Sequence, residues 1–588
     1  MTALRRRGVA AIADAVNDGT SSATAVAEET LARLAAYDRV QPQIWISRIA
    51  PDDLRDAARA VDARVAAGER LPLAGVPYAA KDNIDVAGFE TTAACPAFAY
   101  RPDASAGVIE RLTAAGAICV GKTNLDQFAT GLVGTRSPYG IPRNAYDLAY
   151  VSGGSSSGSA VAVAAGLVGF ALGTDTAGSG RVPAAFNHLI GYKPSKGRWS
   201  TRGLVPACRT LDCITVFTDK VSDARLVDDV VAGFDAADPY SKALADRAIG
   251  RARIGVPRRD QQLWFGDSES EYLYGRALDT LAAKAQIVEL DIAPLLEAAQ
   301  LLYGGPWVAE RTAALAALLA SNPDAIDATV REVVEPGADM TAVALFNGIY
   351  RLAELQRHAD GLWDTVDLLA FPTTGTTYRV AELLAAPIAL NSNLGRYTNF
   401  VNLLDMAAVA IPAGTRTNGT GFGITLIGPA DSDHGLLAIA DDHLAAAELP
   451  CPPPLDLEGK MQSVKLAVVG AHLKDMPLHW QLTSRDATFV GAFETAPTYR
   501  LYAMADSVPP KPALVHSTDG APIALEVYEL DVAAFGSFVA EVPAPLAIGT
   551  VTLSDGSSVK GFVAEPRALT GAEDITSLGG WRAYIARG

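Results

Sequence analysis

Residues 153–160 read GGSSSGSA and residues 173–183 read GTDTAGSGRVP. The apolar residues 158–166 are typical of a helix, and VGFALGTD at 168–175 is typical of a buried strand, so each Gly/Ser-rich stretch lies between regular elements. Successive glycines let backbone N–H groups converge on one spot, which can then bind a phosphate or an oxyanion. A single loop of this kind is equally well a plain turn, so its interpretation depends on the rest of the chain.

A lysine in an apolar stretch provides a third element. Lys81 lies in AAKDNIDV, at the expected end of an extended segment. Most lysines are exposed, which is the plain alternative. Burial would instead lower the pKa of the amine and make it a proton acceptor near pH 7.

Outward from these motifs, the chain alternates strands and helices. Residues 105–118 predict an amphipathic helix that Ser105 caps, and ICVGKT at 118–123 predicts a short buried strand. Residues 20–70 have the spacing of surface helices. This alternation predicts an α/β fold with a central mixed, mostly parallel sheet flanked by helices.

The chain of 588 residues is long enough for two or more domains. Three consecutive prolines in LPCPPPLD at 449–456 predict a stiff linker. After them, runs such as IALEVYEL and VKGFVAE, with a hairpin turn at Asp555-Gly556, predict a small β-rich domain. We therefore expect a first domain over 1–450, a Pro-rich linker over 451–462 and a second domain over 463–588.

The net charge of −17 argues against a nucleic-acid partner and requires a local cationic pocket for any anionic substrate. The longest apolar run, Ala160 to Leu172, is shorter than the roughly 20 residues of a membrane span. The N-terminus does not resemble a signal peptide. The chain also has five irregularly spaced cysteines: Cys95, Cys119, Cys208, Cys213 and Cys451. We therefore expect a soluble, cytoplasmic protein with reduced thiols.

The motifs KDN at 81–83, GGSSSGSA and GTDTAGSGRVPAAF, in that order, resemble those of the amidase signature family. Ser155 and Ser179 are 24 positions apart, as in the family pattern, and the resemblance covers about residues 25–440. It implies that Ser179 is the nucleophile, that Ser155 is the bridging serine, with a cis peptide bond, and that Lys81 is the neutral base. Lys81 would take a proton from Ser155, which takes one from Ser179.

The resemblance also implies an oxyanion hole made by the backbone N–H groups of Thr176, Ala177, Gly178 and Ser179. The family more often has glycine where this chain has Ala177, but alanine still offers an N–H. We expect Asp175 to brace this turn through its carboxylate. The implied chemistry uses no cofactor and no metal, and we interpret the isolated His188 as structural.

Residues 303–311 read YGGPWVAER and place Tyr303 and Arg311 about two helical turns apart. The plain alternative is a helix start with a surface arginine. This segment and the whole C-terminal portion resemble allophanate hydrolases, a branch of the amidase family. The resemblance implies that Arg311 pairs with a substrate carboxylate and that Tyr303 hydrogen-bonds it. The implied substrate is allophanate, urea-1-carboxylate, which yields ammonia and N-carboxycarbamate and finally ammonia and carbon dioxide.

Residues 463–588 resemble the C-terminal domain of allophanate hydrolases, which is similar to gamma-glutamyl cyclotransferases, a small β-barrel with flanking helices. We expect a site near VGAHL at 469–473 that decarboxylates N-carboxycarbamate. His479 is the candidate for binding or proton transfer there, and Glu526 is a weaker one. The alternative is that His479 caps a turn and that the domain only braces a dimer.

Other functions remain open. One is another amidase that acts on malonamate or glutamine, such as the glutamine-hydrolysing component of a tRNA-dependent amidotransferase. Another is a P-loop nucleotide-binding protein built on GAICVGKT at 116–123, and a third is an inactive amidase scaffold. The family resemblance further implies a homodimer. Since we find no biotin-attachment sequence, a biotin-dependent urea carboxylase would be a separate protein.

Overall fold

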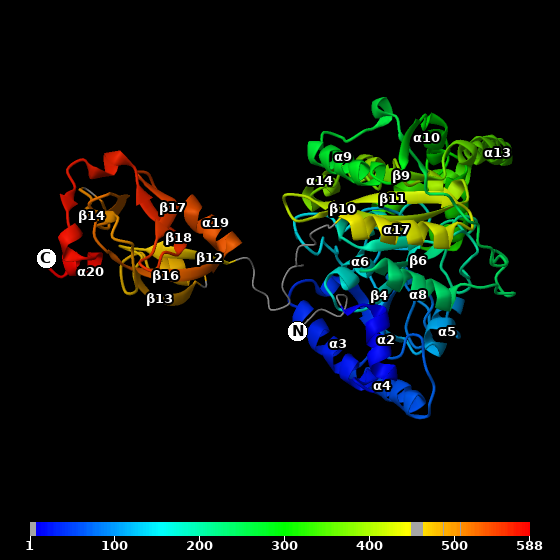
Figure 1. Ribbon diagram of the computed structural model, residues 1–588, viewed down its shortest axis with the longest axis horizontal. Coiled ribbons are helices and arrows are strands. Elements are labelled where there is room, and N and C mark those ends of the chain that lie inside the picture. Colours follow the sequence, from blue (N-terminus) through cyan, green and yellow to red (C-terminus); the bar gives the residue numbers. More distant parts are fainter. Residues whose placement is uncertain (1–6, 448–462, 486, 506, 588) are drawn as a thin grey trace. The chain divides into compact units, whose positions relative to one another are not determined.

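The computed structural model describes residues 7–447, 463–485, 487–505 and 507–587. The chain divides into a larger unit, Met1–Leu457, and a smaller unit, Glu458–Gly588 (Figure 1). The predicted Pro-rich linker, 451–462, lies outside the described residues. None of the described helices is long and apolar enough to cross a membrane.

The larger unit is built on a sheet whose described strands follow the order β1-β3-β2-β4-β6-β5-β10-β11-β9-β7-β8. These strands are β1 (Trp45–Arg48), β2 (Pro77–Lys81), β3 (Ile118–Thr123), β4 (Phe170–Asp175), β5 (Ile190–Lys193), β6 (Cys213–Thr218), β7 (Arg253–Pro257), β8 (Gln286–Leu290), β9 (Leu368–Pro372), β10 (Met406–Thr415) and β11 (Gly421–Pro429).

The sheet is mixed, as expected, but the prediction that it is mostly parallel is wrong. Strand β2 is parallel to β3 and β4, and β7 is parallel to β8 and β9. The other six neighbouring pairs are antiparallel. One antiparallel pair lies in the middle of the sheet, where β10 and β11 form a long hairpin that turns at Gly419 with a φ of 85°. A short connection of this kind can join only antiparallel strands.

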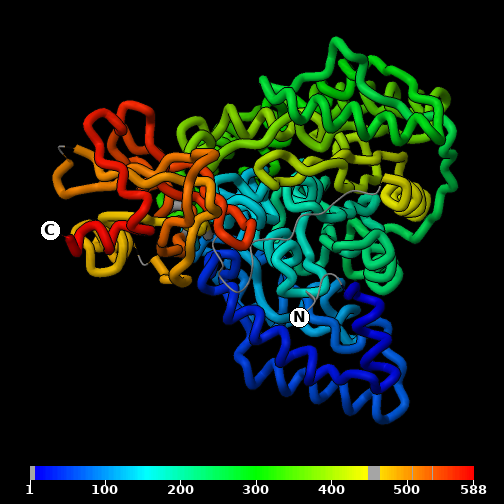
Figure 2. The backbone as a smooth tube through the Cα atoms, turned by 60° about the vertical axis from the view of Figure 1, so that its left-hand side comes forward, coloured from blue at the N-terminus to red at the C-terminus, as the bar shows by residue number. Residues whose placement is uncertain are grey.

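Helices flank this sheet along its whole length. They are α2 (Val9–Asn17), α3 (Ala23–Tyr37), α4 (Pro51–Ala66), α5 (Gly107–Ala114), α6 (Ser157–Ala164), α7 (Val182–Phe186), α8 (Val221–Val231), α9 (Ser268–Ala282), α10 (Ala293–Gln300), α11 (Trp307–Ser321), α12 (Ala328–Val334), α13 (Ala342–Thr365), α14 (Val380–Ala385), α15 (Ala389–Leu394), α16 (Phe400–Leu403) and α17 (Asp433–Ala447). Helices α2 to α4 gather at the blue end of the larger unit, and α9, α10 and α13 at its green end (Figures 1 and 2).

The helix predicted over 105–118 is shorter than expected. It spans Gly107–Ala114, and its N-cap is Ala106. The Ser105 hydroxyl instead accepts a hydrogen bond from the Ala87 amide. The helix ends because Gly116 takes a φ of 91°, after which β3 begins.

The two Gly/Ser-rich loops lie in the deepest part of the larger unit. Every residue from 151 to 195 is buried. Helix α6 is buried all round because SGSAVAVA has no charged face, and it contacts β2, β3, β4 and β6. The end of β2, the start of α6 and the end of β4 are thereby brought together.

The smaller unit has its own apolar core. Its strands are β12 (Ser463–Val468), β13 (Thr488–Glu494), β14 (Tyr499–Ala503), β15 (Pro512–His516), β16 (Ala524–Asp531), β17 (Leu546–Thr552), β18 (Ser558–Ala564) and β19 (Glu573–Asp574), and its helices are α18 (Trp480–Thr483), α19 (Val532–Ala540) and α20 (Trp581–Ile585). Its described strands form a sheet in the order β13-β16-β12-β18-β17 and a second sheet in the order β15-β14-β19. A bridge between Thr495 and Leu553 joins the ends of the two edge strands β13 and β17, which gives the sheet a barrel-like curvature.

Candidate active site

Strand β2 ends at Lys81, whose amine contacts the first Gly/Ser-rich loop. The Lys81 Nζ lies 2.7 Å from Ser155 Oγ and 2.7 Å from Thr174 Oγ1. The peptide bond between Gly154 and Ser155 is cis. The neighbouring hydroxyls face elsewhere: Ser156 donates to the Thr174 carbonyl and Ser157 to the Asn124 carbonyl. Of these three serines, Ser155 is therefore the one next to the lysine.

The Lys81 amine has no exposed surface. Burial lowers its pKa to about 7, although the carboxylates of Asp126, Asp212 and Asp175 act in the opposite direction. A substantial fraction of the amine is therefore neutral at neutral pH, which a general base requires.

Ser179 lies in the turn after β4, and Asp175 fixes this turn. The Asp175 carboxylate accepts hydrogen bonds from the amides of Gly178, at 2.8 Å, and Gly180, at 3.1 Å. Arg181 donates two further hydrogen bonds to the same carboxylate, at 2.8 and 2.9 Å, in a fully buried ion pair. The prediction that Asp175 braces the turn is confirmed. The Ser179 hydroxyl points to the Gly131 carbonyl, at 3.4 Å.

These bonds change the expected oxyanion hole. The Gly178 amide donates to Asp175, so it is not free to bind an oxyanion. Within the described residues, the amides of Thr176, Ala177 and Ser179 donate to no backbone or side-chain acceptor. The expectation for Gly178 is therefore corrected, and three of the four expected donors remain.

Arg311 and Tyr303 meet, although not on one helix as expected. Tyr303 lies in the turn before α11, and its hydroxyl is 3.3 Å from Arg311 Nη2. The guanidinium also lies over the Tyr303 ring, 4.9 Å from its centre. Arg311 is only 1% exposed, donates to Thr130 Oγ1 at 3.1 Å and has no partner for its Nε among the described residues. Thr130, which Arg311 contacts, directly precedes Gly131, whose carbonyl accepts from Ser179. Arg311 and Ser179 therefore contact adjacent residues of the chain.

Two polar groups beside this site were not expected. Asp212 is buried, accepts a short hydrogen bond from Thr176 Oγ1 and also accepts from the Ala207 amide at 2.9 Å. Burial raises its pKa to about 6. Thr174 completes the surroundings of the Lys81 amine. Asp212 lies outside the three motifs, so the motifs gave no signal for it. Thr174 lies inside GTDTAGSG, but its contact with the Lys81 amine was not predicted.

The alternative of a P-loop is excluded by the location of its lysine. Strand β3 runs through GAICVGKT, and Lys122 has no exposed surface. Its amine lies 3.2 Å from the Asp82 carboxylate, which is equally buried. Lys122 is therefore part of an internal ion pair and does not reach a phosphate.

Asp228, Asp229 and His434 bring their ligand atoms within 4.8 Å of one another, as a metal site would. Arg198 occupies this position, because its Nη2 lies 2.7 Å from Asp228 Oδ2 and 2.7 Å from His434 Nε2. The group is an ion-pair network. His188 contacts the Gly419 carbonyl at 3.1 Å, in agreement with a structural role.

In the smaller unit, the Tyr528 hydroxyl lies 3.1 Å from His479 Nε2 and 3.0 Å from the Glu526 carboxylate. Glu526 also accepts from the Lys474 amide and pairs with Arg582 at 2.8 Å. The two residues singled out from the sequence are thus connected through Tyr528. A cavity at the VGAHL loop is lined by His472, and His479 does not line it.

The comparisons with known proteins agree with this geometry. Residues 28–437 match the amidase family, and residues 464–586 match the allophanate hydrolase C-terminal domain. The chain therefore belongs to the amidase family and is an amidohydrolase. Over 97% of its length it is similar to the structure of an allophanate hydrolase from Kluyveromyces lactis, with 42% identity, a TM-score of 0.70 and 98% of that chain covered.

Two further relatives are urea amidolyases, which are much longer proteins. The chain is 42% identical over 98% of its length to urea amidolyase of Saccharomyces cerevisiae, but spans only 33% of that protein. It is 44% identical over 92% of its length to urea amidolyase of Lachancea kluyveri, and spans 31% of that protein. The chain thus corresponds to about a third of each of these relatives.

Proposed function

We propose that this amidohydrolase cleaves the terminal amide of allophanate to ammonia and N-carboxycarbamate. The observation that carries the proposal is the buried Arg311, whose Thr130 contact adjoins Gly131, the residue that accepts from Ser179. A fixed guanidinium there suits a small substrate that carries a carboxylate next to its amide.

In the proposed mechanism, Ser179 Oγ attacks the amide carbon. Its proton passes to Ser155 and from there to Lys81, which the 2.7 Å contact and the lowered pKa of Lys81 support. The developing oxyanion binds the free amides of Thr176, Ala177 and Ser179. Return of the proton to the nitrogen releases ammonia, and water then cleaves the ester on Ser179 by the same route.

The test compares ammonia release from allophanate, malonamate, biuret and glutamine by the full chain. Arg311→Met leaves the substrate carboxylate unpaired, which costs roughly 2–5 kcal/mol, or about 30-fold to several thousand-fold in kcat/KM. The loss should be large for carboxylated substrates and small for biuret. Arg259→Met, at an exposed arginine, is the matched control. An equal loss for biuret would show that Arg311 has a structural role. Faster turnover of glutamine or malonamate would show that allophanate is not the preferred substrate.

We also propose that the division into domains 1–450 and 463–588 corresponds to two reaction steps. In the second step N-carboxycarbamate loses carbon dioxide: one C–N bond breaks, its electron pair stays on nitrogen, and the nitrogen takes a proton. The cavity at VGAHL supports a separate site for this step. The resulting carbamate then breaks down to ammonia and carbon dioxide.

We also propose that the protein is a cytoplasmic homodimer that receives its substrate from another enzyme. The family resemblance favours a homodimer, and a urea carboxylase is the class of enzyme that would supply allophanate. The four described cysteines are free thiols, which supports a reducing compartment such as the cytoplasm.

A further inference from the structure

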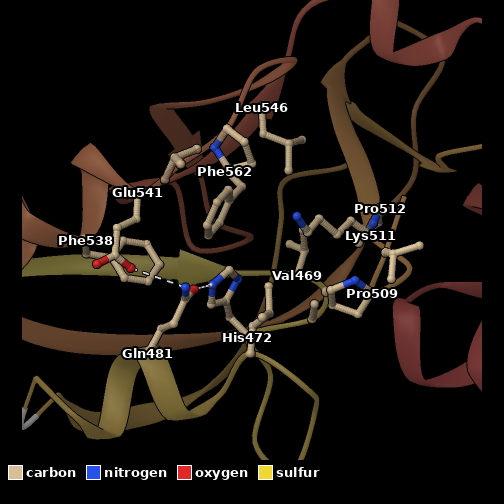
Figure 3. Close-up of a pocket in the computed structure, with 16 residues that line it drawn as sticks. Val469, His472, Gln481, Pro509, Lys511, Pro512, Phe538, Glu541, Leu546 and Phe562 are labelled. Carbon is tan, nitrogen blue, oxygen red and sulfur yellow. Dashed lines mark hydrogen bonds between the residues drawn. The ribbon is translucent and has the colours of Figure 1, made fainter. Parts of the chain in front are cut away.

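A cavity in the larger unit lies next to the candidate active site. Its volume is about 460 Å³, compared with about 220 Å³ for the cavity at the VGAHL loop of the smaller unit (Figure 3). It is enclosed by the start of α11, by α12 and the segment after it, and by α15. The hydroxyl of Tyr303, which lines the cavity, contacts Arg311, so the cavity extends to the site. Its other lining residues include Arg136, Glu332, Met340 and Asn391.

The segment 130–132 connects this cavity to the nucleophile. The first residue of the segment accepts a hydrogen bond on its carbonyl from Arg136 Nη1, at 2.9 Å, and one on its hydroxyl from Arg311 Nη1, at 3.1 Å. The carbonyl of the middle residue accepts from Ser179. The amide of the last residue donates to Asn391 Oδ1, at 2.8 Å. Two residues that line the cavity therefore hold the segment that Ser179 contacts.

Arg136 places a buried positive charge in the wall of the cavity. The residue is only 3% exposed. Its Nη1 and Nη2 donate to the carbonyls of Thr130 and Pro387, at 2.9 and 2.8 Å, and its Nε has no partner among the described residues. No described carboxylate forms an ion pair with this guanidinium, which has five N–H groups to donate. A buried cation that is paired with no carboxylate favours an anion in the adjoining cavity.

A second cavity comes next to the site on the side of Thr176, and its charges are less suited to an anion. Its wall contains the buried carboxylates of Asp212, which accepts from Thr176, and Asp238. Of the two arginines that line it, Arg202 is already paired with two acidic residues and Arg209 is exposed. A carboxylate in the wall repels an anionic substrate, whereas the guanidinium of Arg136 attracts it.

We propose that the cavity beside Tyr303 is the entrance of the active site, and that Arg136 binds the carboxylate of an incoming anionic amide there. The carboxylate then passes Tyr303 to Arg311, where the amide meets Ser179. Arg136 did not figure among the candidates from the sequence. The last step of this path rests on the proposed function, because it requires that Arg311 pairs with the substrate carboxylate.

The first experiment blocks the entrance of the full chain. Met340 lines the cavity, whereas its exposed neighbour Asp339 does not. Met340→Cys and Asp339→Cys are each labelled with benzyl methanethiosulfonate, and ammonia release is measured before and after labelling. We expect labelling to slow Met340→Cys at least tenfold with both allophanate and biuret, and removal of the label with dithiothreitol to restore the rate. Labelled Asp339→Cys and labelled wild type should keep their rates.

The second experiment changes the charge of the entrance in both directions. Arg136→Met should lower kcat/KM for allophanate at least fivefold more than for neutral biuret, through KM, because the carboxylate has left Arg136 before the reaction. Arg136→Lys keeps the charge and should recover most of this loss. Glu332 is an exposed carboxylate in the lining, so Glu332→Gln should raise kcat/KM for allophanate about twofold at low salt. Glu271→Gln, at an exposed glutamate on α9, is the matched control.

Unchanged turnover by labelled Met340→Cys would overturn the entrance, as would an equal loss in labelled Asp339→Cys. An equal loss of kcat for allophanate and biuret in Arg136→Met would show that Arg136 only holds the segment 130–132, and would overturn its role in binding. A wild-type chain that hydrolyses malonamate but not allophanate would refute the proposed function. The same comparisons, made with the anionic malonamate, would then still decide on the entrance and on Arg136.

Discussion

The pH dependence of turnover gives the most direct test of Lys81 as a base. With a pKa of about 7, about half of the amine is neutral at pH 7, about a tenth at pH 6 and about nine-tenths at pH 8. A lysine with the ordinary pKa of about 10.4 would be neutral in roughly one molecule in 2,500 at pH 7. Burial at the end of β2 therefore raises the population of the active form about a thousandfold.

Activity should fall as the pH is lowered, because the neutral form of Lys81 is the active one and low pH protonates it. We expect kcat/KM for ammonia release to be nearly constant above pH 8 and to fall about tenfold per pH unit below pH 6.5. Lys81→Met should lose about 10²–10⁴ in kcat/KM at pH 8, the usual contribution of a general base, and should lose this dependence on pH.

The assay measures initial rates of ammonia release between pH 6 and pH 9. Lys242→Met is the control, because Lys242 is an exposed lysine paired with Asp405, and it should keep the wild-type profile. A wild-type profile that is flat between pH 6 and pH 8 would contradict the reasoning, as would Lys81→Met with more than a tenth of the wild-type activity.

Three further results are expected. Ser155→Ala combined with Lys81→Met should be no slower than the slower single variant, because the two residues act in one relay; additive losses measured in the same assay would contradict this. Lys122→Met should lower the free energy of unfolding by about 3–5 kcal/mol, since it leaves the Asp82 carboxylate buried and unpaired, and denaturant titration against Lys465→Met measures the loss. Asp212→Asn removes a carboxylate that raises the pKa of Lys81, so the acid limb of the profile should move to lower pH, whereas an unchanged limb would show that Asp212 does not act on Lys81.

The sequence indicated segments that meet in the larger unit, because its motifs are local. KDN and the two Gly/Ser-rich loops indicate three segments that the sheet brings together, and only the family resemblance singled out Ser155 within its run of serines. The occupied amide of Gly178 was not predictable, since it depends on which way the Asp175 carboxylate turns.

Contacts between segments that are distant in the chain could not be predicted from the sequence. Asp212 reaches Thr176 only because β6 pairs with β4. Tyr303 and Arg311 were expected near one face of a helix, whereas Tyr303 lies in the turn before the helix and its hydroxyl contacts the guanidinium. In the smaller unit, His479 and His472 are seven positions apart in a short irregular segment. Nothing in the spacing indicates that the cavity is lined by His472 and not by His479.

The uninterrupted burial of residues 151–195 has a consequence for how the enzyme loses activity. Many enzymes carry their reactive groups on surface loops, which open locally while the rest of the molecule stays folded. Here Ser155 and Ser179 lie in the buried interior that packs against the sheet. Displacing them therefore requires a large part of the unit to unfold. Thermal inactivation should therefore coincide with melting of the larger unit.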